Sequence, residues 1–378
     1  MPFVILGISL IFNLWRSPEP LGFGYTKRGI WRPLLLAIVI AGLGFINMWD
    51  LATLGGLLLL AASLKRYGTS RLGLWGSFAS TLPAVVAIIG LGIAIYSPFY
   101  FGTFSSQVQP GIPIGAVLHS TRPIHFFTVW GLALSLIAPF LIAQIFGLLK
   151  GHWNKLGWVL FPDLKKARVV NSLSETPVSS LFLGSIALGV PFMIWAIIHL
   201  AANSDSHPAD LFARFFSVLP LGLISFVSIV AIVNKSRRNS GDAGLFALVL
   251  ITFSLYILYC TELIYVRDMF GNRMNTVFKS YYQVWILLAV AGGYAINYWR
   301  SQHAVWQAPA RYMSKGVAII AIVLVVVAIY YPVAAAFSKA NGFKREATID
   351  GLAFIELAVP DERAAIDWLK KNANSDHI

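Results

Sequence analysis

The sequence contains little charge and a single cysteine, and each shortage excludes a class of protein. Only 12% of its 378 residues are charged, whereas 57% are hydrophobic. A soluble domain carries about 25% charged residues, so this composition indicates a protein with several membrane spans. The lone cysteine, Cys260, cannot form a disulfide within the chain. Its apolar surroundings predict a small buried hydrophobic side chain.

Motifs for several common chemistries are also missing from the sequence. The chain contains no phosphate-binding GxxxxGK[ST] loop, no GxGxxG fingerprint, no paired-cysteine metal motif and no HExxH. His119 and His125 are weak evidence for a metal, because no third ligand is specified nearby. The net charge of +13 would suggest nucleic acid in a soluble protein. The positions of the basic residues give that charge a different explanation.

Ten hydrophobic segments predict an all-α, polytopic bundle of transmembrane helices within residues 1–337. They are approximately residues 2–15, 31–46, 51–64, 74–97, 124–149, 178–201, 211–233, 243–263, 280–299 and 315–336. The second and third segments are short, and Asn47-Met-Trp-Asp50 is expected to join them as a tight hairpin. One long kinked helix is the alternative interpretation.

The basic residues alternate between the connecting loops and predict the orientation of the bundle. Most of them fall in the loops 16–32, 65–73, 150–177, 234–242 and 300–315. The alternate loops and their borders hold only Arg122, Arg214, Arg267, Arg273 and Lys279 before the tail begins. Because cytoplasmic loops are enriched in Lys and Arg, the first group of loops is predicted to be cytoplasmic. The positive charge is therefore a topology signal, and no nucleic acid partner is expected.

Four features are then expected on the extracytoplasmic face, together with the C-terminal tail. They are the hairpin at 47–50, the loops 98–123 and 202–210, and the segment 261–280. The tail, residues 338–378, is polar and contains a predicted short amphipathic helix over Pro360–Lys371. Acidic residues lie in the first turn of this predicted helix and lysines in its last turn, as the helix dipole favours.

The segment 261–280 concentrates ionisable side chains in a chain that otherwise avoids them. It contains Glu262, Arg267, Asp268, Arg273 and Lys279. Such groups at the end of a membrane helix cost desolvation energy unless they meet water, one another or a ligand. One interpretation is a structural network of ion pairs. The functional interpretation is that the cations hold phosphate oxygens while a carboxylate accepts a proton or binds a divalent metal.

Three further polar residues on the same face complete the predicted site. Asp50 is either the N-cap of the following helix or a carboxylate of the site. Arg122 is one of the few outer cations and is expected to join the phosphate-binding group. Asn275 suits an irregular, hydrogen-bonded loop. The catalytic candidates are Asp50, Glu262 and Asp268, and the candidate lipid-phosphate contacts are Arg122, Arg267, Arg273, Asn275 and Lys279.

Several of these stretches carry a family likeness that covers about residues 30 to 370. They are Gly44-Phe-Ile-Asn-Met-Trp-Asp50, Pro98-Phe-Tyr-Phe-Gly102, Arg267-Asp-Met-Phe-Gly-Asn-Arg-Met-Asn275, Lys279-Ser-Tyr-Tyr282, Asp350-Gly-Leu-Ala-Phe354 and Ala365-Ile-Asp-Trp-Leu369. In these stretches the chain resembles the prokaryotic YYY-type integral membrane protein family. That family is similar to the GT-C glycosyltransferases, which use polyprenyl-phosphate sugars.

The resemblance implies a glycosyltransferase-like protein in the plasma membrane of a prokaryote, in contact with membrane lipids. Its substrate would be a polyprenyl-phosphate-linked sugar at the extracytoplasmic face, with Mg²⁺ or Mn²⁺ as the expected metal if it is an enzyme. Asp50, Glu262 or Asp268 would then serve as base or metal ligand.

The chain also departs from the family pattern, which leaves other functions open. It lacks the family's tyrosine triplet and the acidic first outer loop of these glycosyltransferases, so the family's N-terminal part is expected to be missing. The alternative function is a non-catalytic structural subunit of a larger membrane complex, with partner subunits or a separate N-terminal portion. A transporter ranks lower, because the central portions of the spans contain almost no ionisable residues.

Overall fold

A computed structural model confirms the all-α membrane architecture. It describes residues 2–19, 21, 27–103, 114–149, 178–202, 207–268, 271–302, 310–344, 348–351 and 353–373. The predicted loop 150–177 lies outside these residues. Contacts divide the chain into two compact units, Met1–Ile322 and Val323–Ile378. Among the described residues, seven helices are long and apolar enough to cross a membrane, and two shorter helices are also apolar.

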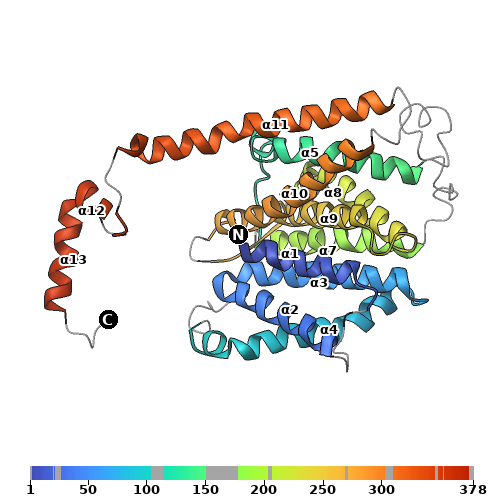
Figure 1. The fold of residues 1–378 in the computed structure, drawn as a ribbon, viewed down its shortest axis with the longest axis horizontal. Helices are drawn as coiled ribbons and strands as arrows, with labels where there is room; N and C mark the ends of the chain where they lie inside the picture. Colours follow the sequence, from blue (N-terminus) through green and yellow to red (C-terminus); the bar gives the residue numbers. More distant parts are fainter. Residues whose placement is uncertain are drawn as a thin grey trace. The chain divides into compact units, whose positions relative to one another are not determined.

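Each predicted hydrophobic segment corresponds to one helix (Figure 1). The helices are α1 (Pro2–Arg16), α2 (Lys27–Ile46), α3 (Met48–Thr69), α4 (Leu74–Ile95), α5 (Pro123–Leu149), α7 (Val178–Ala202), α8 (Pro208–Ser236), α9 (Ala243–Thr261), α10 (Met274–Gln302) and α11 (Ala310–Lys339). A short π-helical turn, Pro98–Thr103, follows α4. Apolar length therefore located these helices correctly.

The chain turns at Asn47 as a hairpin, so the alternative of one long kinked helix is wrong. Asn47 has an extended backbone (φ −158°, ψ 111°), and its side-chain oxygen accepts a hydrogen bond from Trp49 N. Asn47, rather than Asp50, is thus the N-cap of α3. Asp50 lies in the first helical turn, where the helix dipole favours a negative charge. Helices α2 and α3 pack against each other, and α4 packs on both.

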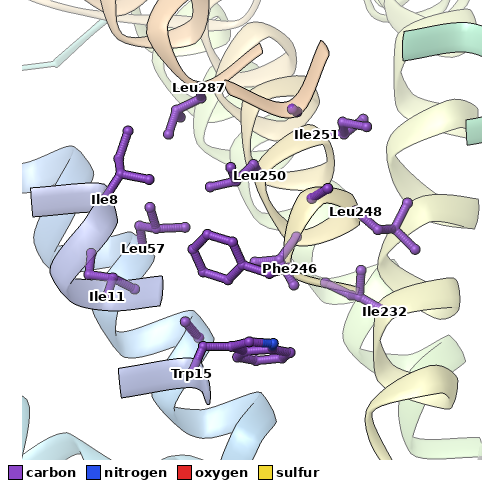
Figure 2. Close-up of a cluster of buried hydrophobic side chains, with 14 of the residues drawn as sticks. Ile8, Ile11, Trp15, Leu57, Ile232, Phe246, Leu248, Leu250, Ile251 and Leu287 are labelled. Atoms are coloured by element: carbon purple, nitrogen blue, oxygen red, sulfur yellow. The ribbon is translucent and has the colours of Figure 1, made fainter. Parts of the chain in front are cut away.

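Helix α9 is the centre of the bundle and packs between α8 and α10. Its side chains are buried on nearly all sides, as expected for a helix that is hydrophobic all round. Figure 2 shows the surrounding cluster: Ile8, Ile11 and Trp15 of α1, Leu57 of α3, Ile232 of α8, Phe246, Leu248, Leu250 and Ile251 of α9, and Leu287 of α10. The Phe246 ring lies 5.0 Å from Phe12 and 5.9 Å from Trp15, measured between ring centroids.

The C-terminal ends of α1, α3 and α8 meet the N-terminal end of α9, and we call this the lysine-rich end. Trp15 Nε1 donates to the backbone oxygen of Asp242, at 2.8 Å. The buried Lys65 ammonium donates to three backbone oxygens at and just after the end of α1, those of Leu14 (2.6 Å), Ser17 (2.5 Å) and Glu19 (2.7 Å). A cation is favourable there because the last carbonyls of a helix have no partner within it.

The second unit contains the rest of α11, a 3₁₀ turn (Asn341–Phe343), α12 (Ala353–Ala358) and α13 (Pro360–Asn372). Helix α13 confirms the predicted tail helix, with acids in its first turn and lysines in its last. Arg363 lies within the helix and pairs with Asp367 at 3.2 Å, one turn later.

We expect Lys65→Met to lower the free energy of unfolding by about 2 kcal/mol, because three backbone carbonyls lose a charged donor. Thermal unfolding of the purified protein in detergent measures the change. Lys315→Met is the matched control, since Lys315 is an exposed lysine in the first turns of α11. Equal melting temperatures for the two variants would contradict the role given to Lys65.

Candidate functional site

A short two-stranded ribbon joins two of the loops that the sequence placed on one face. Strand β1 (Ile114–Ala116) pairs antiparallel with β2 (Ile264–Val266), and Ile114 lies opposite Val266. The backbone bond from Val117 N to Leu263 O, at 2.8 Å, continues the pairing. The ribbon therefore holds the residues before α5 beside the end of α9.

Glu262 is the C-cap of α9 and lies at the centre of the site. Its side chain is only 9% exposed. One carboxylate oxygen accepts from Thr121 N at 2.8 Å and the other from Thr121 Oγ1 at 2.5 Å. Arg273 Nη1 lies 3.4 Å from the carboxylate. Burying this charge is tolerable because both oxygens are hydrogen-bonded and a cation is adjacent.

Two arginines offset the negative end of α9. A carboxylate at a helix C-terminus is unfavourable, because the terminal carbonyls already carry partial negative charge. Arg273 donates to Thr261 O at 3.4 Å and to Thr121 Oγ1 at 3.1 Å. Arg214 donates to Glu262 O at 3.3 Å. Both cations thus reach the end of α9 from other parts of the chain.

Arg214 belongs to this cluster, although the sequence-based site did not include it. It lies near the start of α8, and the residue is only 6% exposed. Its guanidinium donates to Val117 O and Leu118 O, both at 2.6 Å, and to Ser120 Oγ at 2.5 Å. It also lies over the Trp195 ring. In the sequence, the signal for this role was the position of Arg214 among apolar residues. A guanidinium buried there requires several hydrogen-bond acceptors.

An open groove of about 650 Å³ lies beside this cluster, between α5 and α10. Its polar lining includes Thr121, His125, Asn272 and Arg273. Its aromatic lining is Phe278, Tyr281, Tyr282 and Trp285. The side chain of Tyr281 is hydrogen-bonded to Thr121, and its ring packs edge-on against Trp130. A cation and an aromatic wall thus share one accessible hollow.

The other predicted residues of the segment do not line this groove. Asp268 accepts a hydrogen bond from Asn275 Nδ2 at 2.8 Å, so this carboxylate bonds within its own segment of the chain. Arg122 and Arg267 are exposed, and Lys279 is half-buried. Of the predicted phosphate contacts, the described lining of the groove includes Arg273.

Asp50 lies across α10 from the groove, which contradicts the expected convergence. The buried Asp50 carboxylate accepts from Asn47 Nδ2 at 2.8 Å and from Gln283 Nε2. Successive helical residues are rotated by about 100°, so Gln283 projects from the side of α10 opposite Tyr281 and Trp285. Asp50 therefore contributes to packing between α3 and α10.

The described residues do not fit the Mg²⁺ or Mn²⁺ that the resemblance implied. No group of three or more His, Cys, Asp or Glu side chains suited to a metal occurs among them. Both Glu262 oxygens are engaged by Thr121, and Arg273 occupies the position beside them. A metal ion would compete with that guanidinium for the Glu262 carboxylate.

We expect Arg214→Gln to lower the free energy of unfolding by about 3 kcal/mol, because four acceptors lose a buried charged donor. Thermal unfolding in detergent measures it. Arg267→Gln makes the same change at an exposed arginine nearby and should leave the melting temperature unchanged. An Arg214→Gln melting temperature equal to that of Arg267→Gln would show that the network contributes no stability.

Comparison with known proteins places the chain in a family. No curated protein and no solved structure matches it. A family model described as uncharacterized membrane protein (DUF2298) matches residues 1–288. The matched region includes the Glu262 cluster and the whole groove lining. The chain therefore belongs to the DUF2298 family of membrane proteins.

Proposed function

We propose that the groove between α5 and α10 binds a polyprenyl-phosphate-linked sugar and that the protein is a glycosyltransferase-like membrane enzyme. The observation that carries this proposal is Arg273 in an accessible groove with aromatic walls. A guanidinium binds phosphate oxygens bidentately. Tyr and Trp side chains at a membrane surface suit a ligand that is apolar at one end and polar at the other.

Arg273 is held in place while part of it stays accessible. Its side chain is 24% exposed and is fixed by Glu262, Thr121 and Thr261. Arginine has five N–H donors, so these contacts leave donors without a partner among the described residues. A preorganised cation of this kind favours a phosphate because little entropy is lost on binding.

The groove opens at the end of the bundle opposite the lysine-rich end. Glu262 ends α9, whereas Asp242 precedes the same helix at the lysine-rich end. Because cytoplasmic loops are enriched in Lys and Arg, we assign the groove to the extracytoplasmic face of a prokaryotic plasma membrane.

In the proposed reaction the bond from the sugar C1 atom to the phosphate oxygen breaks, and C1 bonds to an acceptor hydroxyl. The phosphate leaves with its electron pair, and Arg273 stabilises that charge. The hydroxyl proton passes to a carboxylate. Glu262 is assigned this role because it contacts two groove residues, Thr121 and Arg273. To accept the proton, it must give up one Thr121 bond.

The second candidate is a non-catalytic subunit of a membrane complex, and one observation favours it. The described lining of the groove contains no carboxylate, because Glu262 lies behind Thr121 and Arg273. A groove of this kind can hold a lipid phosphate without catalysing transfer.

Binding of a polyprenyl monophosphate to the purified protein in nanodiscs tests the proposed ligand. We expect Arg273→Gln to weaken binding about tenfold, because a charge-assisted contact is lost. Arg267→Gln removes the same charge from an exposed position and should bind like the unchanged protein. Equal affinities for all three proteins would exclude Arg273 as the phosphate contact.

Transfer of a labelled sugar from polyprenyl phosphate in isolated membranes separates the two candidates. We expect the unchanged protein to support transfer and Glu262→Gln to lose it while still binding the polyprenyl phosphate. Binding without transfer by the unchanged protein would favour the non-catalytic subunit.

A further inference from the structure

A second groove, of about 310 Å³, opens between α3, α4, α7, α8 and α9. It is lined mostly by apolar side chains, including Leu60, Trp75, Leu183, Ile229 and Phe253. Ligand pockets in proteins hold roughly 300–1,000 Å³. None of these helices forms the walls of the groove between α5 and α10, so the two grooves are separate features of the bundle.

Two polar side chains of α3 each have a buried atom without a described hydrogen-bond partner, and Ser63 is the one of the two that lines this second groove. Ser63 lines it, is 7% exposed, and its Oγ has no hydrogen-bond partner among the described residues. Arg66 follows three residues later, and its buried Nε is also without a described partner. Residues three apart share a helix face, so both lie along one line of α3. Buried unpaired donors are costly, and a ligand with acceptor oxygens would satisfy them.

Arginine side chains lie near the second groove at the lysine-rich end of the bundle. Arg71 is exposed and precedes the groove residue Leu74 by three positions. Arg237 donates to Ser70 O at 3.0 Å and to Leu72 O at 2.8 Å, which ties the connection between α3 and α4 to α8. The sequence contains no Asp or Glu between Asp50 and Asp163, nor between Asp210 and Asp242. Among the described residues of these helices, the acid at this end is Asp242, whose carboxylate caps α9 by accepting from Leu245 N at 2.8 Å.

We propose that this groove holds one acyl chain of an anionic phospholipid, whose phosphate lies at Arg66 and Arg71. The apolar walls accept the hydrocarbon chain, and Ser63 Oγ donates to the ester carbonyl. The two arginines select a negative headgroup, as basic pockets between membrane helices do. The occupant comes from the leaflet at the lysine-rich end. The proposal does not depend on the function proposed for the groove at Arg273.

Native mass spectrometry of the delipidated protein tests the headgroup preference. The probes are phosphatidylglycerol and phosphatidylcholine with identical chains. We expect the unchanged protein to prefer phosphatidylglycerol and Arg66→Gln to reduce that preference about fivefold. Arg300→Gln is the matched control, because Arg300 is exposed near the end of α10 and lies outside the described lining. Equal losses in both variants would reduce the effect to net charge and overturn the site.

Substitutions that fill the second groove with a larger side chain test whether the acyl chain binds there. Ala187 of α7 lines the hollow, so we expect Ala187→Trp to remove one tightly bound phosphatidylglycerol. Ser63→Leu fills the same space with fewer atoms and serves as the second variant if the tryptophan prevents folding. Thermal unfolding confirms that each variant is folded. Unchanged lipid binding in a folded variant would exclude this groove.

Discussion

The buried Glu262 carboxylate imposes the main constraint on one end of the bundle. A negative group at the C-terminus of a helix requires N–H donors and cations, because the terminal carbonyls add to its charge. Thr121 supplies two donors, and Arg273 and Arg214 supply the cations. Thr121 and Arg273 contact the carboxylate, whereas Arg214 donates to the Glu262 backbone oxygen. These partners come from the starts of α5, α10 and α8, so the side chain and backbone of Glu262 together link four helix ends. The ribbon of β1 and β2 holds the intervening backbone.

The same principle operates with opposite sign at the other end of the bundle. There the acceptors are backbone oxygens at and just after the end of α1, and the Lys65 ammonium donates to three of them at once. In both places a charged side chain completes a helix terminus that water cannot easily reach. Charged side chains are scarce in this chain, and these buried ones lie where helix ends have backbone groups to satisfy. A basic or acidic residue in an apolar helix is therefore a useful guide to helix ends.

The sequence predicted the helices well because apolar length is a local property. All ten hydrophobic segments became helices, and the tail helix at Pro360 was also correct. The site was predicted less completely, since it depends on contacts between distant residues. The segment 261–280 did contain Glu262 and Arg273, but Thr121 and Arg214 are joined to it only by the fold. Asp50 contacts Gln283 on the side of α10 away from the groove, which the sequence could not show because hydropathy does not specify how a buried helix is rotated.

The hydrogen bond from Arg273 to Thr121 Oγ1, at 3.1 Å, joins the segment leading into α10 to the start of α5, the two walls of the groove. An anion that took over this donor would remove one of the ties between the walls. The width of the groove and its occupancy are then thermodynamically linked, so each must influence the other. In the proposed complex, a single guanidinium would couple recognition of a charged headgroup to the separation of α5 and α10.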